Sequence, residues 1–221
     1  MISKKTFSFL KDLAENNNRE WFTENKYRYE EAKVEILAFT EKLLSFMKLY
    51  DSTLITTTAA MCQSRIYRDV RFSKNKTPYK TNFGIIIAQN GKKSVGSCYY
   101  LHIQPNESFA AGGYWMPEAE HLKKIRQEID YNASELNSIL TKPTFVKTFG
   151  ELSKEDKLKT RPKGFEIDNP QIELLKLKSY TVSHPMKDSL FLEKTAAEKI
   201  GIVWKELHPL NNFLQNAIAV S

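Results

Sequence analysis

The spacing of apolar residues changes twice along this chain, and no other feature limits the possible folds as strongly. Up to about residue 50, apolar side chains recur every three or four positions, which is the spacing of a helix with one buried face. From about residue 52 to 116 they come in short runs separated by turn residues, a pattern typical of β-strands. Helical spacing then returns. The sequence therefore predicts an α+β fold in which a central, mostly antiparallel sheet is flanked by N-terminal and C-terminal helices.

These three regions predict a single domain over residues 1–221. It comprises N-terminal helices over about 3–50, a sheet region over about 52–116, and C-terminal helices with a short strand over about 117–221. A chain of this length buries enough apolar surface to fold without a metal or a disulfide. Trp21 and Phe22 are expected to anchor the turn between two N-terminal helices, with a ligand platform as the alternative.

The sheet region contains four expected strands and one strong turn signal. Asn90-Gly91 favours a tight hairpin between the second and third strands. Pro209 follows His208 in the last apolar stripe, and because proline interrupts helical hydrogen bonding we expect two terminal helices there. The expected strands span 61–72, 82–89, 98–104 and 108–115, with a further short strand at 180–183.

The composition argues against several classes of protein. Cys62 and Cys98 form no C-x-x-C pair, which indicates free thiols in a reducing compartment, so we expect a cytoplasmic protein. The N-terminus lacks the apolar run of a signal peptide, no segment is apolar enough to span a bilayer, and no membrane partner is expected. The four histidines lie far apart, without zinc-site spacing. We expect no metal and no cofactor, and the pattern assigns no catalytic residue.

The segment RIYRDVRFSKNKTPYK, residues 65–80, has the most unusual charge in the chain. It holds six basic residues and one acidic residue, a local charge of +5 in a chain whose formal charge is +7. If its first half is extended, Arg68 falls among apolar neighbours on one face, where we expect an internal ion pair, with a bound anion as the alternative. A solvated basic loop is the simplest interpretation of such a run. The opposite face carries Arg65, Tyr67, Asp69 and Arg71.

The expected strand 98–104 supplies a second set of polar side chains. Its alternation places Tyr100, His102 and Gln104 on one face, which would share a polar surface with the arginines if the strands are neighbours. Asp69 is expected to hold one of its two flanking arginines and leave the other free. Arginine forks and tyrosine hydroxyls suit the oxygens of a phosphate. The candidate ligand-binding residues of both segments are Arg65, Tyr67, Arg68, Asp69, Arg71, Lys76, Tyr79, Lys80, Tyr100 and His102.

The chain contains NNNREWFTENK at 16–26, RIYRDVRFSKNKTPYK at 65–80, AGGYWMP at 111–117 and RPKGFEIDNP at 161–170. With these stretches it resembles, over nearly its whole length, a bacterial family of uncharacterised proteins, the domain of unknown function 2461. The resemblance implies a single α+β domain and brings no established activity. Through it Arg161 and Lys163, with Asp168, become candidates for closing over the anion site. Asp168 capping a helix near Pro170 is the alternative.

Together these features predict a basic cleft that binds a phosphate-bearing small molecule, with or without catalysis. A nucleic-acid-binding module is the first alternative, since phosphate contacts by lysine and arginine dominate such binding. A module that binds an acidic protein surface is the second. The sequence specifies neither the anion nor the oligomeric state.

Overall fold

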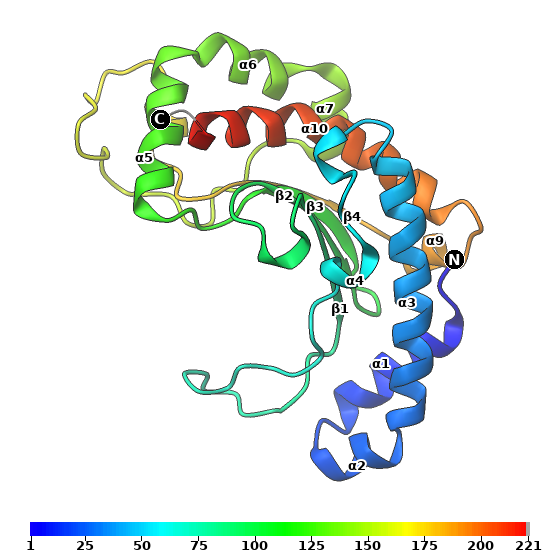
Figure 1. The fold of residues 1–221 in the computed structure, drawn as a ribbon. Coiled ribbons are helices and arrows are strands. Elements are labelled where there is room, and N and C mark those ends of the chain that lie inside the picture. Colours follow the sequence, from blue (N-terminus) through cyan, green and yellow to red (C-terminus); the bar gives the residue numbers. More distant parts are fainter. Residues whose placement is uncertain (220–221) are drawn as a thin grey trace. The chain divides into compact units, whose positions relative to one another are not determined.

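The computed structural model describes residues 1–219 and confirms the α+β fold. Four strands form one antiparallel sheet in the order β1-β2-β3-β4, so each strand pairs with its neighbours in the sequence (Figure 1). The strands are β1 (Phe83–Ile87), β2 (Cys98–Ile103), β3 (Phe109–Tyr114) and β4 (Tyr180–Pro185). All four lie within or close to the ranges that the apolar alternation predicts. Alternate residues of β2 are buried, which leaves its other face for polar side chains.

The chain divides into two compact units. The first comprises Met1–Ser94, Tyr100–Ala110 and Pro185–Ile202, and the second comprises Val95–Tyr99, Ala111–His184 and Val203–Ser221. The single domain over residues 1–221 therefore stays a prediction. In the described range 1–219, none of the helices combines the length and the apolar character needed to cross a membrane.

Three helices begin the first unit: α1 (Lys4–Glu15), α2 (Arg19–Glu24) and α3 (Lys26–Met47). Helix α1 packs against α3 through the apolar stripes that the sequence predicts, and Leu10 and Leu43 are fully buried. The asparagine run ends α1, and the side chain of Asn18 caps α2 by accepting a hydrogen bond from Trp21 N at 2.9 Å. The turn expected around Trp21 and Phe22 is thus a short helix, and the side chain of Phe22 on this helix is buried.

The strand expected over 61–72 is wrong. Its first two residues end a short helix, α4 (Ala59–Cys62), and the rest forms only isolated antiparallel bridges, Gln63 with Ile85 and Tyr67 with Tyr79. The asparagine and aspartate side chains of this region accept hydrogen bonds from nearby backbone N–H groups, and these local bonds compete with a strand ladder.

The tight hairpin expected at Asn90-Gly91 is also wrong. Residues 88–97 join β1 to β2 and contain a 3-10 turn at Gly91–Lys93. The hydroxyl of Thr57 donates to the carbonyl oxygens of Ala88 and Gln89, at 3.1 and 2.7 Å, which fixes the connection from outside. Gly91 has φ +57°, and a Cβ there would lie 2.3 Å from the carbonyl oxygen of Met61, so only glycine fits this approach.

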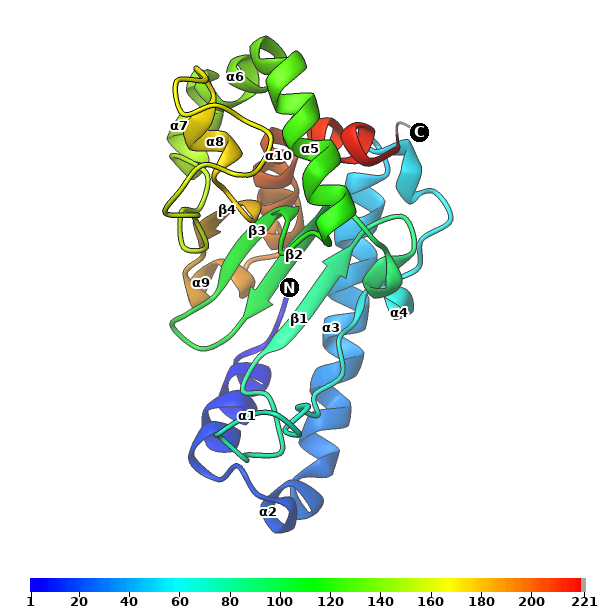
Figure 2. The same ribbon diagram turned by 90° about the vertical axis from the view of Figure 1, so that its left-hand side faces the viewer.

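The second unit is mainly helical, and Figure 2 shows its helices. They are α5 (Ala119–Tyr131), α6 (Ala133–Thr141), α7 (Pro143–Phe149) and α8 (Ile172–Leu175). The C-terminal helix α10 (Ala196–Ala219), which has residues in both units, is continuous through Pro209, so the expected division into two helices is wrong. Trp204 and Leu207 before the proline, and Leu210 and Phe213 after it, are all buried in the second unit. Their burial outweighs the roughly 3 kcal/mol cost of an internal proline.

Candidate anion-binding site

The basic segment (residues 65–80) is a long excursion of the first unit between α4 and β1, drawn in teal in Figures 1 and 2. Its two arms pair at the base, where Arg68 N donates to Pro78 O at 2.9 Å and Lys80 N donates to Ile66 O at 2.8 Å. Beyond these bonds the segment has no regular secondary structure. Its base is therefore defined by backbone pairing, and its tip, residues 69–77, by side-chain contacts.

The base is held against the connection between α1 and α2. Tyr79 is buried and stacks on Phe22, with ring centroids 4.0 Å apart and an interplanar angle of 15°. Asn17 bonds the backbone of Tyr79 twice: its amide nitrogen donates to Tyr79 O, and its side-chain oxygen accepts from Tyr79 N, both at 3.0 Å. Tyr79 is thus a packing residue of the base, and its predicted ligand contact stays a prediction. The part played by Asn17 was not foreseen from the sequence.

Two arginines of the basic segment have internal partners. Arg71 is held by Asp69 through Nε–Oδ1 at 2.9 Å and Nη2–Oδ2 at 2.6 Å, as expected for one of the two arginines that flank Asp69. This hydrogen bonding lowers the pKa of the Asp69 carboxyl. The prediction of an ion pair for Arg68 is wrong within the first unit. Its guanidinium donates instead to the hydroxyls of Thr77 and Ser73, the latter at 3.4 Å, so the group is hydrogen-bonded but its charge is not neutralised.

The lysines of the tip reach different surroundings. Lys76 Nζ donates to Val70 O at 2.9 Å, which closes the tip of the segment. Lys74 is exposed. Neither lysine pairs with a carboxylate of the first unit, so apart from Arg71 every cation of the basic segment keeps its charge uncompensated there.

Lys80 and Arg65 lie at the base and differ from the cations of the tip. The ammonium of Lys80 is half-buried, and burial lowers its pKa, with the nearby charge of Arg65 lowering it further. No carboxylate of the first unit is within ion-pair distance of either group, and the Lys80 ammonium has no hydrogen-bond acceptor there. A half-buried cation beside a second cation is a costly arrangement unless an anion joins it.

The polar face of β2 lies near Lys80, whose charge acts on His102. His102 Nε2 lies 2.9 Å from Gln104 Oε1, and its Nδ1 lies 3.1 Å from the Tyr100 hydroxyl and 3.3 Å from the Asn82 amide nitrogen. An amide oxygen only accepts, so Nε2 carries the proton and Nδ1 accepts from both of its neighbours. Burial lowers the pKa of His102, and the charge of Lys80 lowers it further, which favours this neutral form. Tyr100 and Gln104 therefore contact His102 on one polar surface, with Asn82 as an unforeseen member, whereas the sharing of this surface with the arginines stays a prediction.

The remaining predicted residues are placed differently. Tyr67, half exposed, packs against Tyr79 in a tilted arrangement, with ring centroids 5.3 Å apart and an interplanar angle of 49°. Arg161 and Lys163 belong to the second unit, where Arg161 Nη1 donates to Phe165 O at 2.7 Å. Their role at the anion site stays a prediction. The backbone before α8 is bonded by Asn169, whose Oδ1 accepts from Gln171 N at 2.8 Å, and not by Asp168.

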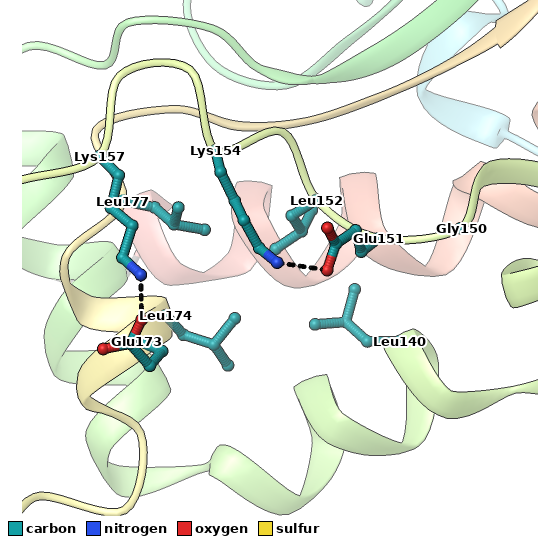
Figure 3. A pocket seen from close by; sticks show the side chains of 9 residues that line it. All are labelled: Leu140, Gly150, Glu151, Leu152, Lys154, Lys157, Glu173, Leu174 and Leu177. Carbon is teal, nitrogen blue, oxygen red and sulfur yellow. Dashed lines mark hydrogen bonds and ion pairs between the residues drawn. The ribbon is translucent and has the colours of Figure 1, made fainter.

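The second unit contains a separate pocket of about 140 Å³ (Figure 3). Its floor is apolar, and charged side chains stand at its rim, where Lys154 pairs with Glu151 and Lys157 with Glu173. Because each rim cation is already paired, the pocket offers no free charge to an anion. Its apolar lining consists of Leu140, Leu152, Leu174 and Leu177.

No group of three or more potential metal ligands occurs among residues 1–219. The model of a sequence family described as "Conserved hypothetical protein (DUF2461)" matches residues 5–213. No curated protein and no solved structure matches the chain significantly.

Proposed function

The chain belongs to the DUF2461 family, and from the chemistry of its first unit we propose that it binds the phosphate group of an anionic ligand at the base of the basic segment. The site consists of Arg65 and Lys80, bordered by Tyr100, His102 and Asn82. One observation carries the proposal: Lys80 is a half-buried cation beside Arg65, without a carboxylate of the first unit to balance it.

The charged form of Lys80 is unfavourable in the empty site and favourable when an anion is bound. A half-buried ammonium loses part of its hydration, and a second cation nearby adds repulsion, so the charged site is destabilised when it is empty. A bound phosphate reverses both effects, because it accepts hydrogen bonds from the ammonium and from the guanidinium fork. Folding alone gives no reason to retain this arrangement.

The polar face adds a donor for the ligand. Tyr100 and Asn82 both reach Nδ1 of His102, so that nitrogen keeps one hydrogen bond if the other donor turns away. Tyr100 can therefore turn its hydroxyl proton to a phosphate oxygen without leaving Nδ1 unsatisfied. His102 is a positioning residue, because it orients the Tyr100 hydroxyl and keeps its bond to Asn82 when that hydroxyl turns to the phosphate. No catalytic step is proposed.

Calorimetric titration with pyrophosphate at low salt tests this proposal. We expect Lys80→Met to weaken binding at least tenfold, because it removes the half-buried charge and keeps the apolar stem. Lys74→Met is the matched control: it removes the same charge from an exposed position of the same segment and should change the affinity less than twofold. Equal binding by wild type and Lys80→Met would contradict the proposal.

The proposed ligand agrees with the cytoplasmic location that the sequence predicts. Phosphate-bearing metabolites and nucleic acids are abundant in the cytoplasm. An acidic protein surface would contact the same cations, but it would not need a half-buried ammonium, because surface pairing draws on exposed charges. The base of the segment therefore favours a phosphate over an acidic partner.

A further inference from the structure

The tip of the basic segment exposes an aromatic ring that packing does not explain. Phe72 is 96% exposed, although the alternation of the sequence places it with the apolar side chains of the segment. Its only ring contact within the first unit is with the guanidinium of Arg71, 5.9 Å from the ring centroid. A single exposed apolar side chain is common on protein surfaces. Phe72 is distinguished by its place in a segment where most cations have no carboxylate partner within the first unit, so a partner would meet a ring and positive charges together.

We propose that the basic segment binds single-stranded nucleic acid, with a base stacked on Phe72 and the phosphates on the surrounding cations. This inference rests on the proposed function, because the phosphate site at Lys80 and Arg65 would take one phosphate of the strand. It adds a ligand class and a second contact, the ring at the tip. Tyr67, 52% exposed on the same segment, offers a second aromatic face.

The pattern of charges and rings suits a strand of nucleic acid. Single-strand binders combine a basic track for the backbone with aromatic side chains for the bases, and each stacked base adds roughly 1–3 kcal/mol. In the basic segment both kinds of side chain occur together, and only one cation is neutralised within the first unit, by Asp69. Within the first unit, the cations of the segment that have no carboxylate within ion-pair distance are Arg65, Arg68, Lys74, Lys76 and Lys80.

Two other polymers fit the tip less well. A DNA duplex keeps its bases stacked on one another, so a protein ring gains a stacking partner only after unstacking them at additional cost. An anionic membrane would receive a single aromatic ring, and even a full acyl chain gives only marginal membrane binding. The unpaired bases of a single strand need neither unstacking nor deep insertion.

Fluorescence anisotropy with a labelled dT15 oligonucleotide and an abasic strand of equal length separates stacking from charge. We expect the wild type to prefer dT15 over the abasic strand by roughly 5- to 100-fold, since only dT15 carries bases. Phe72→Leu keeps an apolar side chain without a ring and should lose most of this preference, because only the partly exposed ring of Tyr67 remains for a base. Phe72→Trp should keep it, with its added fluorescence quenched by dT15. Because Phe72 packs against nothing in the core, all three proteins should fold alike.

The salt dependence provides an independent readout of the cations. Five phosphate contacts on a single strand predict a slope of about −3.5 in log K against log salt, or roughly a hundredfold weaker binding between 50 and 200 mM. Phe72→Leu should leave this slope unchanged, and the double variant Lys74→Met, Lys76→Met should reduce its magnitude by about 1.4.

The outcomes separate this inference from the proposed function. If the wild type binds pyrophosphate through Lys80 but binds dT15 no better than the abasic strand, the inference fails and the phosphate site stands. If Lys80→Met leaves pyrophosphate binding intact, the phosphate site fails. Tighter binding to a 15-base-pair duplex, or binding to phosphatidylserine vesicles that depends on Phe72 while dT15 does not compete, would also overturn the single-strand inference.

Discussion

Two polar segments of this chain contain lysine and arginine in similar density but balance these charges to different extents. In residues 151–164 of the second unit, Lys154 pairs with Glu151 and Lys157 pairs with Glu173. In the basic segment of the first unit, residues 65–80, only Arg71 is paired with a carboxylate. Residues 151–164 hold five basic and three acidic residues, and two of the basic ones pair with carboxylates; the basic segment holds six and one, and a single pair forms within the first unit. The basic segment therefore keeps the larger net positive charge that an external anion can meet.

The two segments are also anchored differently. Residues 151–164 are fixed through backbone bonds, Ser153 N to Thr181 O and Leu158 N to Lys176 O, both at 2.8 Å, and through the buried Leu152. The basic segment is fixed at its base by Phe22 and Asn17, which contact Tyr79. Rings and amides hold that base without using any charge. This division of roles between anchoring groups and cations supports the proposal of an anion site at that base.

The largest effect should follow loss of the aromatic anchor. Phe22→Ala removes a buried ring stacked on Tyr79, and we expect a loss of about 3–5 kcal/mol in the free energy of unfolding. Urea denaturation of the full chain measures this change. Phe72→Ala removes the same side chain from an exposed position and should alter stability by less than about 0.5 kcal/mol. Similar losses for both variants would mean that the base is not the anchored part of the segment.

A smaller effect, with the opposite sign, should follow removal of the half-buried cation. Lys80→Met should stabilise the protein by about 0.5–1 kcal/mol while it weakens pyrophosphate binding at least tenfold, because the charge remains partly screened by water and serves a ligand more than the fold. Lys157→Met should change stability little in either direction, because Lys176 also pairs with Glu173, at 3.0 Å. Thermal unfolding of the two variants measures both. A clear destabilisation by Lys80→Met would show that its charge has a structural partner.

Much of the fold was predictable because apolar periodicity reports which side of an element is buried. The alternation in β2 and the stripe of α3 depend on local spacing, and burial bears out both. The errors arose where distant contacts decided the outcome. The hydroxyl of Thr57 fixes the turn after β1, and packing on both sides of Pro209 keeps α10 continuous. Thr57 lies 31 and 32 positions before the residues that it bonds, and the apolar residues around Pro209 are visible in the sequence while their packing partners, such as Tyr99 against Trp204, are not.

The candidate site was predictable in its residue types but not in its pairings. Alternation correctly placed Tyr100, His102 and Gln104 on one polar surface. It could not show that Arg68 would be satisfied by hydroxyls, or that Phe72 would be exposed, because both depend on the irregular path of the tip. The sequence specifies the chemical groups at each position. Whether a charge is neutralised depends on which groups the fold brings beside it.

The smallest predicted effect is a difference in pH dependence between the two regions. Burial lowers the pKa of His102 below its ordinary value of 6.5, so as the pH falls below 6.5 the unfolded chain takes up the proton first, and stability falls until the folded pKa is passed. Hydrogen bonds from Lys157 and Lys176 lower the pKa of Glu173 below 4.5, so its contribution is present above pH 4.5 and is lost at more acidic pH. Urea unfolding at stepped pH measures these effects. In His102→Gln the free energy of unfolding should depend less steeply on pH just below pH 6.5. In Glu173→Gln the pH dependence should change only below pH 4.5. If His102→Gln changed only the acidic limb, the imidazole would not be the neutral, half-buried group near Lys80, and the exchange proposed for the Tyr100 hydroxyl would lose its basis.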